Sequence, residues 1–469
     1  MISGFLSWVP GPWMDEGATL VSAQRSWPSL LMLLDQVDAV HGLYYAVMHL
    51  WFELVGASPL TLRAPSAIAV GVATGLLVRL GQRLVDRRAG ILAALSFLLL
   101  PAVTWMGGEG RSVAMATAAA TLVMTLFIEA VERQRTAWWI GYALSLLLSL
   151  TVSLLTALLF VVLPLALFVG RASRRQWVAF VASSLAAGVA SVPLLLKVVS
   201  QQRQVSWVGE PSIKGLLAYP REVWFPNPGS DLYVVLAWLV LLTGVTWFLL
   251  AARRDGWRTP CSLGRRGVVV LLLGWLLLPP LLVTAWALIG TNLYVPRYLM
   301  PSAPGLALVI GVGLSAARPR WLAVMALLTQ VAILTPPWID QRHETAKAPT
   351  SLVAETVSVL IRPGDAVLFV NGGKHGWTRV ARYAYPDAFG TASDLTLGVP
   401  ADESTMVAET TVLLREVPER LAGVDRVVAI VADEPHERGL ADLAALAQSG
   451  FVKTDSVAVD QWSIEVFER

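Results

Sequence analysis

Three short polar segments contain the side chains that could do chemistry. The side chains concerned are Asp15 and Glu16, Glu109 and Arg111, and Arg297 with Tyr294 and Tyr298. A carboxylate can take the proton of an attacking hydroxyl group, and an arginine can hold a phosphate through paired hydrogen bonds. One base with several cations suits the transfer of a sugar from a phosphate, because a phosphate leaves well once its charge is stabilised.

The two carboxylates of the first segment are expected to have different roles. Asp15 and Glu16 are adjacent, and adjacent side chains point in different directions both in a helix and in an extended strand. Such a pair does not supply the two carboxylates that flank one bond in a glycosidase. The alternative interpretation is that each polar segment only caps or anchors a helix at a membrane surface, where arginine and tyrosine are common. Three such segments on one side of a membrane favour a shared site.

The composition is typical of a protein that crosses a membrane several times. Of the 469 residues, 55% are apolar and only 15% are charged. The net charge of +3 comes from arginines in short clusters between apolar runs, a pattern of cytoplasmic loops rather than of a nucleic-acid-binding surface. The single Cys261 excludes an internal disulfide framework, and the five histidines lack metal-ligand spacing.

Ten apolar runs predict about ten full membrane spans between residues 62 and 337. The runs are 62–82, 89–106, 111–131, 137–151, 153–170, 176–199, 232–252, 267–289, 299–317 and 321–337. With these spans the arginine clusters all lie on one face, which the positive-inside rule makes cytoplasmic. The three polar segments and the whole tail then lie on the opposite face. This count requires residues 137–170 to form two short helices instead of one long one.

The segment after the acidic pair is predicted to lie on the membrane surface. His41–Gly56 is apolar, but its length of about 16 residues falls short of the roughly 20 that a span needs. A full span there would put Asp15 on the side of the arginines at 83–88. Residues 1–13 are also too few for a span, so we expect either that the chain begins outside or that its first helix is incomplete.

The chain after residue 340 is predicted to form a small extracytoplasmic α/β domain, 341–469. It follows a membrane module, 1–340, whose first extracytoplasmic loop is 13–61. The predicted elements of the tail are strands at 366–370 and 426–432 and helices at 350–361 and 439–448. We therefore expect an all-α polytopic membrane protein with a C-terminal α/β domain.

The order of the motifs resembles GT-C glycosyltransferases, most closely bacterial enzymes of the family 39 type, which are related to protein mannosyltransferases and aminoarabinose transferases. The matching residues are Trp13–Glu16, His41–Tyr45, Trp51, Gly56, Leu62–Ser66, Gly108–Ser112, Gln201–Pro211 and Pro296–Tyr298. They cover about residues 13–305, and the tail matches more loosely. The resemblance rests on the order and topology of these motifs.

The resemblance implies a GT-C helical bundle and an inverting transferase in the bacterial cytoplasmic membrane, with its site on the extracytoplasmic face. The implied donor is a polyprenyl monophosphate carrying a mannose- or arabinose-like sugar, and the acceptor is a cell-envelope glycan, glycolipid or protein. The catalytic candidates are Asp15 as base, Glu16, and Glu109 at the second acidic position. The candidate donor phosphate contacts are Arg111, Arg297 and Tyr298, and the candidate substrate contacts are His41, Tyr44, Tyr45, Arg63, Gln201 and Trp207.

Two other functions remain as alternatives. A lipid-linked sugar flippase or other transporter should show polar residues near the bilayer midplane and internal repeats, and the sequence has neither. A non-catalytic membrane scaffold would have a cavity without convergent Asp15, Glu109 and Arg297. No cofactor, metal site or nucleic-acid partner is predicted, although the carboxylates leave room for a divalent cation.

Overall fold

A computed structural model of the chain describes residues 2–202, 208, 213–226, 231–253, 259–287, 294–373 and 376–469. The chain divides into two compact units. We call them the helical unit, with residues 1–5, 39–44 and 64–339, and the mixed unit, with residues 6–38, 45–63 and 340–469. The mixed unit therefore combines most of the predicted first loop with the tail.

The helical unit consists of helices and short 3-10 segments. Its elements are η1 (Ala39–His41), the start of α3 (Gly42–Val55), most of α4 (Pro59–Leu84), α5 (Arg87–Leu98), α6 (Pro101–Gly107), α7 (Val113–Arg133), α8 (Thr136–Val152), η2 (Leu154–Val161), α9 (Val162–Val169), α10 (Arg174–Ser200), α11 (Ile213–Trp224), α12 (Asp231–Arg253), α13 (Gly264–Ala287), η4 (Pro296–Ser302), α14 (Ala303–Ser315) and α15 (Trp321–Asp340).

Seven helical segments of the described chain are long and apolar enough to cross a membrane, and the bent pair α5 and α6 makes an eighth if it counts as one span. The number is below the predicted ten because three apolar runs form broken or short helices. The pair α5 and α6 bends by 68° just before Pro101, whose ring cannot continue a helical hydrogen-bond ladder. The break at Ser153 divides residues 137–170 into α8 and the η2–α9 segment. The chain is a multi-pass membrane protein.

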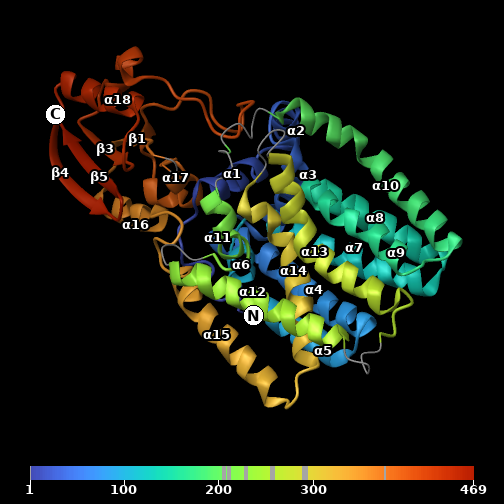
Figure 1. Cartoon of the computed structure of the whole chain (residues 1–469). Coiled ribbons are helices and arrows are strands. Elements are labelled where there is room, and N and C mark those ends of the chain that lie inside the picture. Colours follow the sequence, from blue (N-terminus) through green and yellow to red (C-terminus); the bar gives the residue numbers. More distant parts are fainter. Residues whose placement is uncertain are drawn as a thin grey trace. The chain divides into compact units, whose positions relative to one another are not determined.

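Helix α14 is the central helix of the helical unit. Every residue from Ala303 to Leu314 is buried, and the helix packs against α5, α12 and α13 (Figure 1). The contact with α5 is close because position 311 is a glycine: a Cβ there would overlap the backbone of Ala93. Small residues at helix contacts in membranes allow this kind of approach, since van der Waals packing drives helix association in lipid.

The mixed unit combines short helices with a sheet domain. Its elements are α1 (Met14–Ala23), α2 (Trp27–Gln36), the rest of α3, the start of α4, α16 (Thr350–Leu360), β1 (Ala366–Val370), α17 (Val380–Ala384), η5 (Pro386–Phe389), β2 (Ser393–Asp394), η6 (Leu414–Glu416), η7 (Pro418–Leu421), β3 (Arg426–Val431), α18 (Glu437–Gln448), β4 (Val452–Val459) and β5 (Trp462–Glu468). Helix α3 has 14 residues, too few for a full span.

The five strands form one sheet in the order β2-β1-β3-β5-β4, parallel between β2, β1 and β3 and antiparallel elsewhere. Strand β1 is buried on both faces because alternate side chains enter two cores. Leu368 and Val370 pack with Leu446 of α18, whereas Phe369 packs with Val357 of α16. Helices α18 and α16 lie on opposite faces of the sheet (Figure 1). The predicted helical membrane fold with a C-terminal α/β domain is confirmed.

We expect Gly311→Val to destabilise the helical unit, because the added side chain must separate α14 from α5. Overpacking of this kind costs about 1–3 kcal/mol, so the midpoint of thermal unfolding in detergent should fall by several degrees. Gly71→Val in α4 is the matched control, since a Cβ there meets nothing within 4 Å. An equal midpoint for the two variants would contradict the close contact.

Candidate functional site

The acidic pair begins helix α1, and its second member is the centre of a buried ion-pair cluster. The side chain of Glu16 is fully buried. Arg63 donates from Nε to Glu16 Oε1 at 2.7 Å and from Nη2 to Oε2 at 2.5 Å, and Lys347 Nζ donates to Oε1 at 3.0 Å. Both oxygens of Glu16 are therefore held by cations, which offset the cost of burying its charge.

Arg63, the partner of Glu16 in this ion pair, also binds the backbone that precedes α1. Its side chain is fully buried, and Nη1 donates to the carbonyl oxygens of Ser7 and Pro10 at 2.6 and 2.7 Å. The sequence predicts a substrate contact for Arg63 and catalysis for Glu16. In the structure these two side chains bind each other and the backbone before α1, so we assign them the positioning of that helix.

A second buried arginine accompanies this cluster. Burial, followed by repulsion from the charge of Arg63, lowers the pKa of Arg342 to about 10. Such a shift is expected where positive charges outnumber carboxylates in a region with little water. The start of the tail therefore adds cations beside the acidic pair.

Asp15 and Glu16 differ in direction and in exposure, as expected for adjacent residues of a helix. It lies in the first turn of α1 and is half-buried, whereas Glu16 points into the cluster. A carboxylate in the first turn is favoured by the partial positive charge at a helix N-terminus. Asp15 is thus the more accessible of the two carboxylates.

Helix α1 is supported by the tail within the mixed unit. A Cβ at Gly17 would overlap the side chain of Val380 in α17, so the two helices are in close contact. Arg25 donates to the carbonyl oxygens of Ser404 and Met406 at 2.7 and 2.5 Å. Tyr45, a predicted substrate contact, is fully buried and donates to Asp38 Oδ2 at 2.8 Å. These contacts fix the elements around α1.

The helical unit contains a cavity of about 440 Å³ that gathers four of the predicted residues. They are His41, Gln201, Arg297 and Tyr298. The rest of the lining is mainly apolar and comes from α7, α8, η2, α10, α13 and η4. It includes Val152, Leu154, Leu155, Leu195, Val198, Val199 and Trp286. The cavity therefore has an apolar wall and a polar, cationic part.

The polar side chains of the cavity and its surroundings contact one another and the backbone through hydrogen bonds and a cation–π interaction. Arg111 Nη2 donates to His41 Nε2 at 3.2 Å, which makes that ring nitrogen the acceptor. The backbone N–H of Ala39 donates to Gln201 Oε1 at 2.9 Å. The guanidinium of Arg297 lies 5.5 Å from the ring centroid of Tyr298, within cation–π range.

Two of the other predicted residues, Glu109 and Tyr44, are deeply buried and are not among the described residues that line the cavity. Glu109 is 1% exposed and lies between α6 and α7, and Tyr44 is also 1% exposed. Trp207 lies outside the described residues. In the part of the chain that the structure describes, no group of three or more His, Cys, Asp or Glu side chains could hold a metal ion.

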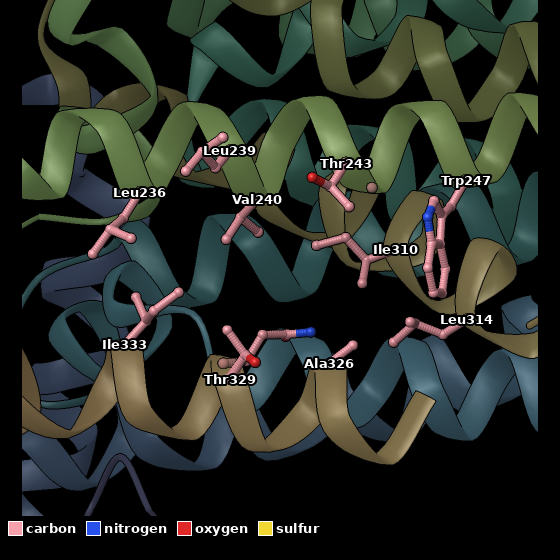
Figure 2. A pocket seen from close by; sticks show the side chains of 12 residues that line it. Leu236, Leu239, Val240, Thr243, Trp247, Ile310, Leu314, Ala326, Thr329 and Ile333 are labelled. Carbon is pink, nitrogen blue, oxygen red and sulfur yellow. The ribbon is translucent and has the colours of Figure 1, made fainter. Parts of the chain in front are cut away.

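Another groove of the helical unit has a different character (Figure 2). It has a volume of about 290 Å³ and lies between α12, α14 and α15, which contribute Trp247, Ile310 and Ile333, among others. None of the twelve described residues that line it is ionisable. This groove offers no acid, base or cation, so the cavity with Arg297 is the stronger candidate.

Comparisons with known proteins bear on the fold of the chain. The model of the family described as dolichyl-phosphate-mannose-protein mannosyltransferase matches residues 43–198. A comparison with curated protein sequences gives no match. The solved structure of ArnT from Cupriavidus metallidurans in the apo state is similar over 99% of this chain and 95% of ArnT, with a TM-score of 0.60 and 14% identity. The chain has the GT-C fold.

Further structures with the GT-C fold support the predicted resemblance, which is confirmed. ArnT from Cupriavidus metallidurans bound to undecaprenyl phosphate gives a TM-score of 0.56 at 13% identity, covering 99% of this chain and 96% of ArnT. The arabinofuranosyltransferase AftD from Mycobacteria gives 0.53 at 17% identity, and the match covers all of this chain but only 39% of AftD.

Some residues of the ion-pair cluster and of the cavity were not predicted from the sequence. Lys347 falls in the predicted separate tail, although it is one of only five lysines and follows the last span closely. Ser112, Ser153 and Trp286 line the cavity but carry no pattern that separates them from other membrane residues. Apolar cavity walls and lipid-facing surfaces have the same composition, so only the packing distinguishes them.

We expect Arg63→Met to destabilise the protein strongly, because it removes the cation that binds both oxygens of the buried Glu16. Breaking a buried ion pair from one side costs about 3–5 kcal/mol. The measurement is the midpoint of thermal unfolding, with Arg87→Met as a control on an exposed arginine. Because the two residues form one unit, Glu16→Gln combined with Arg63→Met should cost less than the sum of the single changes. Additive losses would argue against the pair.

Proposed function

We propose that the protein is a membrane glycosyltransferase that uses a polyprenyl-monophosphate sugar as donor. The cavity of the helical unit carries this proposal, because an apolar wall beside Arg297 suits a ligand with a long hydrocarbon chain and an anionic head. The family description and the ArnT structure bound to undecaprenyl phosphate support the same class of donor. The sugar is mannose- or arabinose-like, and the acceptor is a cell-envelope glycan, a glycolipid or a protein.

The proposed reaction is a single displacement with inversion at the anomeric carbon. The acceptor oxygen forms a bond to that carbon while the bond from the carbon to the phosphate oxygen breaks. Asp15 takes the proton of the acceptor hydroxyl, and the lipid phosphate leaves with the bonding electron pair. The half-buried position of Asp15 supports its role as base, whereas Glu16 is occupied by Arg63 and Lys347.

Arg297 is proposed to stabilise the charge that develops on the departing phosphate. Arg111 acts beside it through His41, which it holds at 3.2 Å. Fixed donors aimed at a developing negative charge usually contribute more to such catalysis than any other effect, since they need no reorganisation during the reaction. Glu109 and Tyr298 remain proposed members of the site.

The proposed location is the bacterial cytoplasmic membrane, with the site on the extracytoplasmic face. The arginine pattern supports it, because Arg83 and Arg133 lie in the last turns of α4 and α7 and bind the buried carboxylate of Glu129. Clustered arginines of this kind mark cytoplasmic helix ends.

We expect Asp15→Asn to lower the rate of sugar transfer by about 10²- to 10⁴-fold, which is the range for loss of a general base. The amide keeps the shape of the side chain but cannot take the acceptor proton. The measurement is transfer from a synthetic polyprenyl-phosphate sugar by purified protein, with Asp387→Asn on the exposed tail as control. Full activity in Asp15→Asn would end the assignment of the base. Movement of labelled donor lipid across vesicles without product would favour a flippase.

We expect Arg297→Gln to reduce the transfer rate by about 10²-fold, because one preorganised donor to the leaving phosphate is lost. It should also weaken binding of a sugar-free polyprenyl phosphate, and Arg297→Lys should recover part of both losses by restoring the charge. Arg320→Gln at an exposed position is the control. Unchanged lipid binding in Arg297→Gln would contradict the assigned contact.

A further inference from the structure

A separate cavity lies wholly within the mixed unit, at the edge of the sheet where β2 pairs with β1. It has a volume of about 430 Å³. The lining consists of Arg379, Arg382, Tyr383, Ala392, Ser393, Asp394, Leu397, Gly398 and Arg420. A cavity of this size fits a small ligand, and three arginines at one small site call for an explanation.

The most deeply buried of these arginines, Arg379, is charged and is paired with two carboxylates. Arg379 forms ion pairs with Asp394 at 2.7 Å and Glu409 at 2.5 Å, and Tyr383 donates to Glu409 at 2.8 Å. Burial alone would lower the pKa of Arg379, but the hydrogen bonds and charges of the two carboxylates outweigh it and raise the pKa. Arg379 therefore forms a rigid floor for the cavity.

The other two arginines are not neutralised in this way. Arg382 Nη2 donates to the carbonyl oxygen of Ala392 at 3.1 Å, while its Nη1 is buried and has no hydrogen-bond partner among the described residues. Arg420 Nη1 donates to the carbonyl oxygens of Leu395 and Leu397 at 3.0 and 2.7 Å. Neither arginine forms an ion pair with a carboxylate in the described chain. A buried guanidinium N–H without a partner is costly, and a ligand oxyanion would satisfy it.

The remainder of the cavity has the opposite polarity. Asp394 and the carbonyl oxygen of Leu397 are hydrogen-bond acceptors, and the hydroxyl of Ser393 can both donate and accept. Asp394 already accepts hydrogen bonds from Arg379, and the lone pairs that remain on its carboxylate can accept from a neutral hydroxyl of the ligand. The cavity thus presents cations to one part of a ligand and acceptors to another part.

We propose that this cavity binds an acidic sugar, with its carboxylate or phosphate on Arg382 and Arg420 and its hydroxyl groups toward Asp394. The ligand is either a free sugar or the terminal unit of an acidic glycan. This site goes beyond the proposed transferase, because it requires neither the cavity of the helical unit nor the base Asp15.

The test is direct binding by isothermal titration calorimetry with the full chain in lipid nanodiscs. The probes are glucuronate, glucose 1-phosphate, inorganic phosphate and glucose. We expect glucuronate or glucose 1-phosphate to bind at least about tenfold more tightly than inorganic phosphate, and glucose to show no binding. Binding of inorganic phosphate as tight as that of both acidic sugars would overturn the proposal, and so would binding of none of the probes.

Variants locate the bound ligand. Arg382→Gln should weaken binding of the acidic sugar by about tenfold or more, because it removes a charge-assisted hydrogen bond. Arg415→Gln, an exposed arginine of the same domain, is the charge-matched control and should change affinity less than twofold. Arg420→Gln is a second variant, and the unfolding midpoint of each protein shows that it is folded. Equal affinities of Arg382→Gln and Arg415→Gln would overturn the assignment, and these outcomes do not depend on transferase activity.

Discussion

The buried carboxylate of Glu16 is the interaction on which the mixed unit depends. It joins three segments that are far apart in the sequence: α1, the start of α4 at Arg63, and the start of the tail at Lys347. A buried carboxylate is unfavourable without cations, so these segments must be assembled together. Asp15 is the residue before Glu16, and its position follows from the same cluster. Glu16 is thus held in the cluster, and Asp15 is the carboxylate of the pair that we propose as the base.

The cavity of the helical unit is the basis for the proposal that the protein binds an amphipathic anion. In a bilayer, an apolar wall alone does not distinguish a ligand from surrounding lipid, because both are equally apolar. We propose that Arg297 and the hydrogen-bonded pair of Arg111 and His41 supply the distinction through charge. None of the described residues that line the groove in Figure 2 is ionisable, so the groove offers no such charge.

Residues of the tail pack against α1 and accept hydrogen bonds from the residue Arg25 that follows it. The side chain of Val380 fills the space that a side chain at position 17 would occupy. The carbonyl oxygens that accept from Arg25 belong to Ser404 and Met406 in a loop of the tail. The arginine-lined cavity at β2 belongs to the same sheet domain. Its floor, Arg379, also binds Glu409, whose other oxygen accepts a hydrogen bond from Tyr383 of α17.

The sequence by itself determined that the chain crosses a membrane several times, that its tail is an α/β domain and where the polar segments lie, because hydrophobic runs and arginine clusters are local patterns. It predicted the strands at 366–370 and 426–432 almost to the residue. Only the tertiary structure decided that Glu16 and Arg63 bind each other, that the first loop packs with the tail, and that His41, Gln201 and Arg297 line one cavity. The physical reason is that ion pairs and cavities form between segments distant in the chain, and no local spacing records which charge meets which.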